Sequence, residues 1–313
     1  MFRDAFLIVD RLRSNLSSVV LGKSDAVRSV VIALISGEHI LLDDVPGVGK
    51  TLIARATARS IAATFKRIQF TPDLLPSDIV GSNLYRPDTH QFEFSHGPVF
   101  ANVVLADEIN RAPPRTQSAL LEAMSEGRVS VDGTTYELPQ PFTVVATQNP
   151  IEFEGTYRLP ESQLDRFLLR TRVGYPQRDV ERSVLQSHRL TEPVAGLEPV
   201  ATDAEIVSTQ QAVRKVRVED SVVDYLLSIV EATRNSSELD LGVSTRAALS
   251  FYRGCQGRAI TEHRDFVIPE DVKSLAVSVL SHRVIPRGAH QFSDMSTTDQ
   301  IIQDILDSTP VPV

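Results

Sequence analysis

The feature that most constrains this chain is a glycine-rich loop, Asp44 to Thr51 (DVPGVGKT), between an apolar run and an alanine-rich segment. The run from His39 to Asp43 has the composition of a short buried parallel strand, and residues 51–63 have that of a helix. Gly47 and Gly49 let backbone N–H groups turn inward together and hold phosphate oxygens. The following helix directs the positive end of its dipole at the same anion. A strand, a loop ending in Gly-Lys-Thr and a helix therefore predict a phosphate-binding loop on a parallel sheet.

Two side chains of this loop have the chemistry needed to bind ATP with magnesium. We expect Lys50 to reach the β- and γ-phosphates, and the Thr51 hydroxyl to coordinate Mg²⁺. The first glycine position of the pattern is occupied by Asp44, which places an extra carboxylate near the site. Because the terminal Gly-Lys-Thr makes most of the phosphate contacts, the prediction does not depend on that glycine. The expected nucleotide-binding residues of the loop are Pro46, Gly47, Val48, Gly49, Lys50, Thr51 and Leu52.

A pair of acidic residues supplies the second element that such a loop requires. Four apolar residues, 103–106, predict a buried strand, and Asp107 and Glu108 follow at its carboxyl end. Ligands of open α/β sheets bind at this edge. Because consecutive strand side chains point to opposite faces, the two acids can have different roles. We expect Asp107 to hold Mg²⁺, and Glu108 to orient and deprotonate the attacking water as a general base.

A polar amide follows the next predicted strand, residues 142–147. Asn149 stands in Gln-Asn-Pro, and an Asn-Pro pair is by itself a turn signal. Coming after the acidic pair, Asn149 is also placed to contact the γ-phosphate and the attacking water. We favour this sensor role over the turn.

The pattern of elements changes along the chain. Strands alternate with helices up to Pro176, which predicts a parallel sheet with helices on both faces over residues 1–176. Residues 177–313 read as a smaller all-helical lid domain without a convincing strand. The expected lid helices are 177–189, 203–215, 219–235, 244–258 and 269–281.

Composition argues against several other classes of protein. The 313-residue chain has a formal net charge of −8, whereas a protein that coats nucleic acid needs a basic face. Its one cysteine, Cys255, permits no internal disulfide, and no HExxH or CxxC motif suggests structural zinc. No run of about 20 uncharged apolar residues is present, and charges interrupt the N-terminal apolar residues. We expect a cytoplasmic protein without a membrane span, and nucleic acid is an unlikely partner.

Taken together, these motifs resemble those of the AAA+ ATPases, and most closely the MoxR family. The resemblance extends from about residue 4 to 285. It implies an AAA+ α/β nucleotide-binding core followed by a helical lid. The stretches that carry it are GPVF (97–100), LADEINRAPPRTQSALLEAMSEG (105–127), ATQNPIEFEGTY (146–157) and LPESQLDRFLLR (159–170).

The family resemblance also implies roles for two arginines. Arg166 in LDRF matches an arginine finger that acts on the ATP of a neighbouring subunit, and Arg246 in GVSTRA matches the sensor-2 arginine of the lid. An arginine stays charged and stabilises charge developing on the γ-phosphoryl group. A surface ion pair is the alternative for each. Two positions depart from the family pattern, Arg158 and Thr245, where proline is common.

Other segments match the adenine side of the family's site and its two inserts. Val20 and Gly22 match the adenine-flanking segment, with Tyr175-Pro176 as a weaker candidate. One insert, a hairpin within the second helix, is expected at about 81–96. The other, before the sensor strand, is expected at about 128–138, where an Asp-Gly pair favours a hairpin turn. Both hairpins are expected to face either a partner or ring pore, or a neighbouring subunit.

Several functions are compatible with this resemblance. The leading expectation is Mg²⁺-dependent ATP hydrolysis that drives chaperone-like remodelling, maturation or assembly of partner proteins, in a homo-oligomeric, hexameric ring. The resemblance also suggests a partner with a von Willebrand factor A domain. The alternatives are the motor subunit of a chelatase-like metal-insertion complex and a nucleotide-dependent switch. A nucleic-acid translocase fits the net charge poorly.

Overall fold

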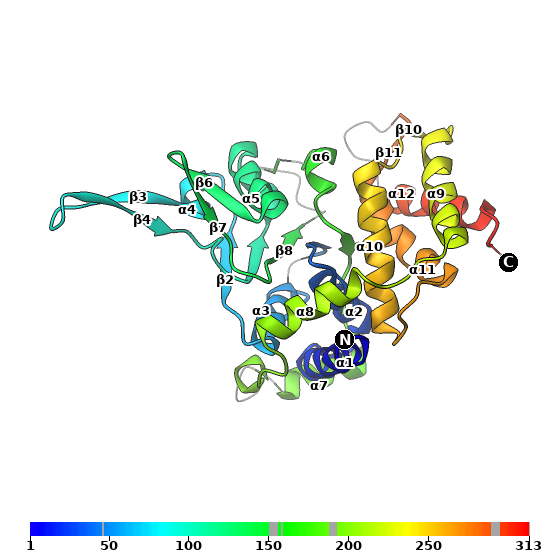
Figure 1. Cartoon of the computed structure of the whole chain (residues 1–313), viewed down its shortest axis with the longest axis horizontal. Helices are drawn as coiled ribbons and strands as arrows, with labels where there is room; N and C mark the ends of the chain where they lie inside the picture. The colour runs from blue at the N-terminus through cyan, green and yellow to red at the C-terminus, as the bar shows by residue number, and fades with distance from the viewer. Residues whose placement is uncertain (46, 150–155, 158, 188–192, 289–294, 313) are drawn as a thin grey trace.

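A computed structural model describes residues 1–45, 47–149, 156–157, 159–187, 193–288 and 295–312 (Figure 1). Its centre is a five-stranded sheet in the order β2–β5–β8–β1–β9. Each neighbouring pair of strands is parallel. The strands are β1 (Ile40–Asp43), β2 (Phe65–Gln69), β5 (Val103–Asp107), β8 (Thr143–Gln148) and β9 (Leu169–Thr171). The predicted parallel sheet is confirmed, and the short edge strand β9 is an addition to it.

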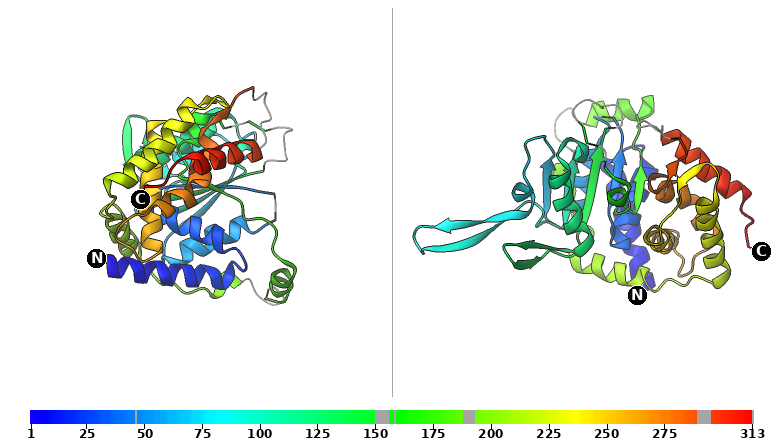
Figure 2. Two further views of the ribbon diagram at one scale, coloured as in Figure 1. Left: turned by 90° about the vertical axis from the view of Figure 1, so that its right-hand side faces the viewer. Right: turned by 90° about the horizontal axis from the view of Figure 1, so that it is seen from above.

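Helices cover both faces of this sheet, as Figure 2 shows from above. In β5, Val103 and Leu105 face one apolar core, and Val104 and Ala106 face the other. This alternation explains why the strand is apolar throughout. The first core includes α1 (Phe2–Val19), α2 (Ser24–Ser36) and α3 (Lys50–Ser60); the second includes α4 (Pro76–Val80) and α5 (Pro114–Glu126).

The C-terminal part is mainly helical, as predicted. Its helices are α7 (Arg178–Ser187), α8 (Asp203–Val213), α9 (Asp220–Asn235), α10 (Thr245–Thr261), α11 (Pro269–Leu280) and α12 (Met295–Ser308). Short 3-10 turns lie at η2 (Pro193–Gly196) and η3 (Ser281–Arg283). Helix α8 packs on α1 and α2, and α9 to α12 pack on one another. A domain boundary at residues 176 and 177 remains a prediction.

Two features of this region differ from the sequence prediction. Strands β10 (Leu239–Leu241) and β11 (Ile285–Pro286) form an antiparallel pair, although no strand was expected after Pro176. Segments of two or three residues are too short to show an alternating pattern, which explains the error. Helix α12 was not predicted, although Ile301, Ile302, Ile305 and Leu306 bury one helical face.

Both predicted inserts are hairpins. The first consists of β3 (Gly81–Arg86) and β4 (Gln91–His96), and the second of β6 (Arg128–Val131) and β7 (Thr134–Glu137). The first follows the five-residue helix α4 and extends away from the body of the molecule in Figures 1 and 2. The hairpins touch through Phe94 and Tyr136, whose rings stack with centroids 4.0 Å apart. Among the described residues, no helix is long and apolar enough to cross a membrane.

Candidate active site

The phosphate loop lies between β1 and α3, at the carboxyl edge of the sheet. Gly47 and Gly49 have φ angles of 84° and 99°, a backbone region that side chains with a Cβ rarely adopt. A Cβ at either position would meet no atom within 4 Å, so the loop borders open space. Val48 and Leu52 pack against the core and anchor the loop. Pro46 lies outside the described residues.

The Lys50 amine is held at the ends of two adjacent strands. It donates to the carbonyl oxygens of Asp44, at 2.5 Å, and Gln148, at 3.3 Å. Burial lowers the pKa of Lys50, and the nearby carboxylates, Asp107 foremost, oppose that shift. Both of these hydrogen bonds are to neutral carbonyl groups, so no acidic partner neutralises the Lys50 charge through them and it can act on a phosphate.

Asp44, the residue that departs from the loop pattern, has a structural role. Its carboxylate accepts hydrogen bonds from the backbone N–H groups of Val45, at 2.8 Å, Val173, at 2.7 Å, and Gly174. The side chain therefore points toward residues 173–174 and ties the start of the loop to the chain beyond β9. This explains how the loop accommodates a carboxylate in place of glycine.

Asp107 ends β5 and is held by two residues that the sequence did not suggest. Its Oδ2 accepts from Arg67 Nε, at 3.0 Å, and Nη2, at 2.6 Å, and its Oδ1 accepts from the Thr147 hydroxyl, at 2.7 Å. Arg67 lies on β2 and Thr147 on β8, the strands on either side. Arg67 and Gln69 are polar residues at alternating positions of β2. This alternation is the sequence feature that hinted at polar contacts on this side of the strand.

Glu108 follows directly and has different partners. Its φ of 57° is a left-handed conformation, uncommon for a residue other than glycine. The Thr147 hydroxyl accepts from the Glu108 N–H at 2.9 Å, and the Glu108 Oε2 accepts from Gln69 at 2.8 Å and Arg111 at 3.2 Å. Backbone strain of this kind clusters at functional sites because the surroundings enforce it. As a result of this turn, the carboxylates of Asp107 and Glu108 have different hydrogen-bond partners.

Asn149 lies at the same edge as the acidic pair. It directly follows β8 and is buried. Gln148 pairs in register with Asp43, next to the phosphate loop. The structure therefore places Asn149 just after β8, the strand between β1, which leads to the loop, and β5, which ends in Asp107.

The predicted adenine-side segments also come together. Lys23 donates to the Gly174 carbonyl at 2.7 Å, which joins the α1–α2 turn to the chain just before Tyr175. Gly22 has a φ of 67°, and a Cβ there would lie 2.9 Å from the Val180 side chain of α7. Val20 is buried, whereas Tyr175 is 76% exposed. The phosphate loop, acidic pair, Asn149 and these segments thus form what we call the loop face.

Arg166 and Arg246 lie close to each other and form what we call the arginine face. Arg166 follows α6 (Glu161–Leu164), and Arg246 is in the first turn of α10. Burial and the charge of Arg246 lower the pKa of Arg166, while Asp165, Glu122 and Glu126 raise it. Arg246 is exposed. The charges that act on Lys50 belong to a different set, namely Asp107, Asp44, Asp43 and Glu108. Arg166 and Arg246 are not among the charges that shift the pKa of Lys50.

Asp165 links the arginine face to the helical region. The Ser244 hydroxyl donates to its Oδ2 at 3.2 Å, and Arg283 Nε lies 3.2 Å from its Oδ1. Ser244 also caps α10 by accepting from the Ala247 N–H at 3.0 Å. The Arg283 side chain is 1% exposed and donates to the Phe167 carbonyl at 2.8 Å. These contacts hold Asp165 and Ser244, which lie next to Arg166 and near Arg246 in the chain. Ser244 and Arg283 were not predicted to have this role.

Of the other residues singled out in the sequence, one, Arg111, contacts Glu108. Arg111 and Arg115 are exposed, Thr245 is the first residue of α10, and Arg158 lies outside the described residues. No cluster of three or more His, Cys, Asp or Glu side chains suited to a metal occurs in the described ranges. The open loop and the isolated Asp107 carboxylate fit a magnesium ion that arrives with phosphates and retains waters.

Comparisons with known proteins agree with this geometry. Residues 39–169 match the model of the ATPase family associated with various cellular activities (AAA), and residues 231–305 match an AAA lid domain. The chain is 46% identical to the YeaC protein of Bacillus subtilis, across 99% of this chain and 97% of that protein. It is 39% identical to the chaperone MoxR1 of Mycobacterium tuberculosis, across 97% and 82% respectively.

A solved structure is similar over almost the whole length. The crystal structure of a presumed ATPase from Cytophaga hutchinsonii superposes with a TM-score of 0.88 at 35% identity, covering 99% of this chain and 98% of that one. The fold, with its AAA core and helical lid, is thus shared. The chain belongs to the MoxR family of AAA+ ATPases.

Proposed function

We propose that this ATPase hydrolyses ATP at sites shared between neighbouring copies in a hexameric ring. The loop face of one copy binds ATP, and the arginine face of the next copy completes the site. The observation that supports this most directly is the separation of the two charge sets: Arg166 interacts with Arg246 and lies outside the carboxylate group around Lys50. Two adjacent arginines repel each other, and a phosphate from another copy would relieve that repulsion.

Within the shared site, each residue has a defined task. The backbone of Gly47 to Gly49 and the Lys50 amine bind the phosphates, and Val20 and Gly22 flank adenine. Glu108 accepts a proton from the attacking water as its oxygen bonds to the γ-phosphorus and the β–γ bridge breaks, which releases ADP and phosphate. Asn149 orients this water. Mg²⁺, held by Thr51 and Asp107, would neutralise phosphate charge.

The arginines act on charge that develops during the reaction. Arg166 and Arg246 would contact the γ-phosphoryl oxygens of the neighbour's ATP. A finger of this kind raises kcat by about 10³–10⁵. Asp165, which precedes Arg166 in the chain, is bound by Ser244 and Arg283, so the position of Arg166 also depends on the arrangement of the helical region.

We further propose that hydrolysis drives remodelling or assembly of partner proteins. One relative is named a chaperone. The exposed rings of Phe92 (72%) and Tyr85 (50%) on the projecting hairpin offer an apolar contact for a client or for a von Willebrand factor A domain partner. A chelatase-like motor and a nucleotide switch remain the alternatives.

Mixing two inactive variants tests the shared site. Arg166→Ala lacks the arginine finger and Glu108→Gln lacks the base, so each alone should lose at least about 10² in kcat. In an equimolar mixture, roughly a quarter of ring interfaces join an intact loop face to an intact arginine face, so activity should return.

The matched control is a mixture of Lys50→Ala with Glu108→Gln, which damages one face only and should stay inactive. Light scattering on the same samples reports assembly. If the first mixture gives only the average of its two components while rings form, the site lies within one chain and the proposal fails.

A further inference from the structure

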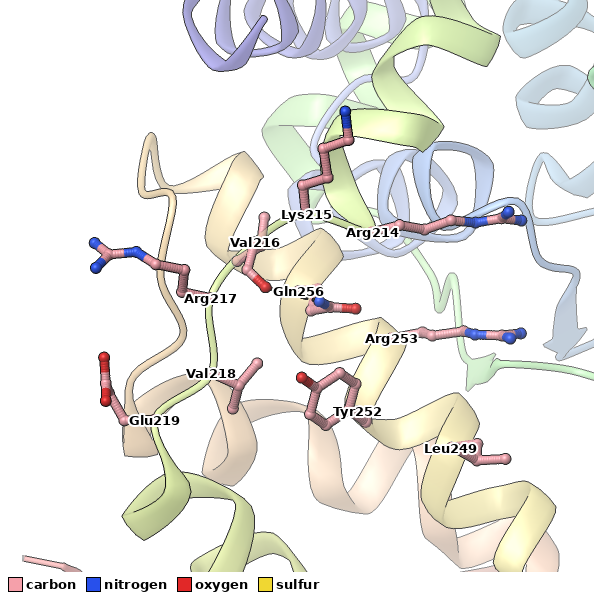
Figure 3. A pocket seen from close by; sticks show the side chains of 10 residues that line it. All are labelled: Arg214, Lys215, Val216, Arg217, Val218, Glu219, Leu249, Tyr252, Arg253 and Gln256. Atoms are coloured by element: carbon pink, nitrogen blue, oxygen red, sulfur yellow. Dashed lines mark hydrogen bonds between the residues drawn. The ribbon is translucent and has the colours of Figure 1, made fainter.

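A second surface of the molecule has no role in the proposed reaction. In contrast to the acidic chain as a whole, it is lined mainly by cationic side chains. It is a groove of about 620 Å³ between residues 214–219 and α10 (Figure 3). Four cationic residues line it, Arg214, Lys215, Arg217 and Arg253, against a single acid, Glu219. In a chain with a net charge of −8, this concentration of positive charge is exceptional.

Not all of these charges are neutralised within the chain. Arg253 pairs with Glu38 at 2.9 Å, and Arg217 lies 4.0 Å from Asp265. Arg214 and Lys215 are exposed and have no carboxylate within 4.0 Å among the described residues. In Figure 3, Arg214 and Arg253 extend in the same direction. An anionic ligand on that side would therefore meet Arg214, which forms no ion pair within the described part of the chain, beside Arg253, while Lys215 extends in another direction.

The floor of the groove is apolar and rigid. Val218, Leu249 and Tyr252 line it, and Leu249 is 57% exposed. Gln256 is buried and donates to the Val216 carbonyl at 2.8 Å, which fixes the segment against α10. A second anchor is the bridge between Arg217 and Phe266. A positive rim around an apolar floor suits a ligand that carries both acidic and apolar side chains.

We propose that this groove binds an extended acidic segment of a partner protein, with an apolar side chain seated on Leu249 and Tyr252. Charge complementarity and the apolar floor favour a peptide over nucleic acid. Protein–DNA interfaces commonly neutralise about 6–10 phosphates, more than these four cations supply, and two of the four already have acidic neighbours.

The position of the groove connects it to the arginine face. Arg246, Leu249 and Arg253 are spaced by three and four residues along α10, so they share one side of that helix. Arg246 and Arg253 are about 10 Å apart along the axis at 1.5 Å per residue. A partner segment bound here would contact the helix that carries Arg246.

The test is binding of a short fluorescein-labelled peptide, rich in glutamate with one central phenylalanine, to the full chain without nucleotide. Anisotropy should show saturable binding that weakens with salt. Arg214→Glu/Lys215→Glu should weaken it at least tenfold, while Arg11→Glu/Lys66→Glu, with the same charge change at exposed positions elsewhere, should stay within about twofold.

Four outcomes would overturn the proposal. Equal binding to the parent and to the groove variant would place the peptide elsewhere, and undetectable binding to the parent would exclude the site. Stronger competition by an oligothymidine of equal charge than by unlabelled peptide would indicate a nucleic-acid groove. If the groove variant fails to assemble without peptide, as judged by light scattering, the surface is an interface between copies. Because no nucleotide is used, these outcomes are independent of the proposed hydrolysis.

Discussion

The loop face and the arginine face are built in opposite ways. On the loop face, acidic and polar groups have partners on adjacent strands: Asp107 is held by Arg67 and Thr147, and Glu108 by Gln69. On the arginine face, Arg166 and Arg246 lie together, and burial with the charge of Arg246 lowers the pKa of Arg166. The carboxylates of the loop face have cationic or polar partners, whereas the two adjacent cations of the arginine face repel each other, and an external anion would relieve that repulsion. The difference explains why a ring would bring the faces together.

The largest effect should come from the base on the loop face. Glu108→Gln keeps the shape and the acceptor for Gln69 but cannot take a proton from water, so kcat should fall by about 10²–10³. Binding of a fluorescent ATP analogue should remain within about twofold, because phosphate contacts come from the loop. Steady-state kinetics with parallel titrations measures both. Undiminished turnover would assign the proton transfer to another group.

Much of the loop face followed from the sequence, because its motifs are local. The loop lies between its own strand and helix, so Gly49, Lys50 and Thr51 are placed by residues next to them. Arg67 and Thr147 could not be assigned in advance, because each lies 40 residues from Asp107 and only the strand order brings them together. On the arginine face, Asp165 and Arg283 are 118 residues apart, and no periodicity connects them.

A smaller effect is expected from the link between the arginine face and α10. Ser244→Ala removes the hydrogen bond to Asp165 and also the cap of α10. Arg246 would then be held less firmly, and kcat should fall about three- to tenfold with ATP affinity unchanged. The comparison of turnover with binding separates this positioning role from a loss of substrate contacts.

Thr202→Ala is the matched control, because Thr202 caps α8 by accepting from the Glu205 N–H at 3.3 Å, away from the arginines. Loss of either cap should cost about 1 kcal/mol of stability. The comparison isolates the Asp165 contact if only the Ser244 variant loses turnover. Equal losses of kcat in both variants would attribute the effect to stability alone.

The next effect concerns magnesium on the loop face. Arg67 donates two hydrogen bonds to Asp107 Oδ2 and therefore occupies an oxygen that could otherwise bind an ion. Arg67→Ala should free this oxygen and lower the Mg²⁺ concentration for half-maximal binding of a fluorescent ATP analogue by about two- to threefold. Lys66→Ala, at the neighbouring exposed position of β2, is the control. A higher magnesium requirement in the Arg67 variant would mean that Arg67 orients Asp107 for the ion instead of competing with it.

The smallest expected effect is on stability alone. It comes from His282, which precedes Arg283 in the chain. His282 is buried, its Nε2 is 2.9 Å from the Phe167 carbonyl, and burial together with Arg283 holds its pKa well below the ordinary value. Above about pH 6.5 the ring is neutral in both states and contributes no pH dependence. Below that value the unfolded chain binds a proton that the folded chain does not, so stability falls as the pH falls.

Urea unfolding between pH 7 and pH 5 measures this contribution. His282→Gln, which retains a donor for the Phe167 carbonyl, should reduce the pH slope by up to about 1.4 kcal/mol per pH unit. The remaining slope includes His39, another buried imidazole with a lowered pKa. His90→Gln, on the exposed hairpin, should leave the slope as in the parent. A parental slope in the His282 variant would show that this imidazole titrates alike in both states, and the arginine face would then gain no acid sensitivity from it.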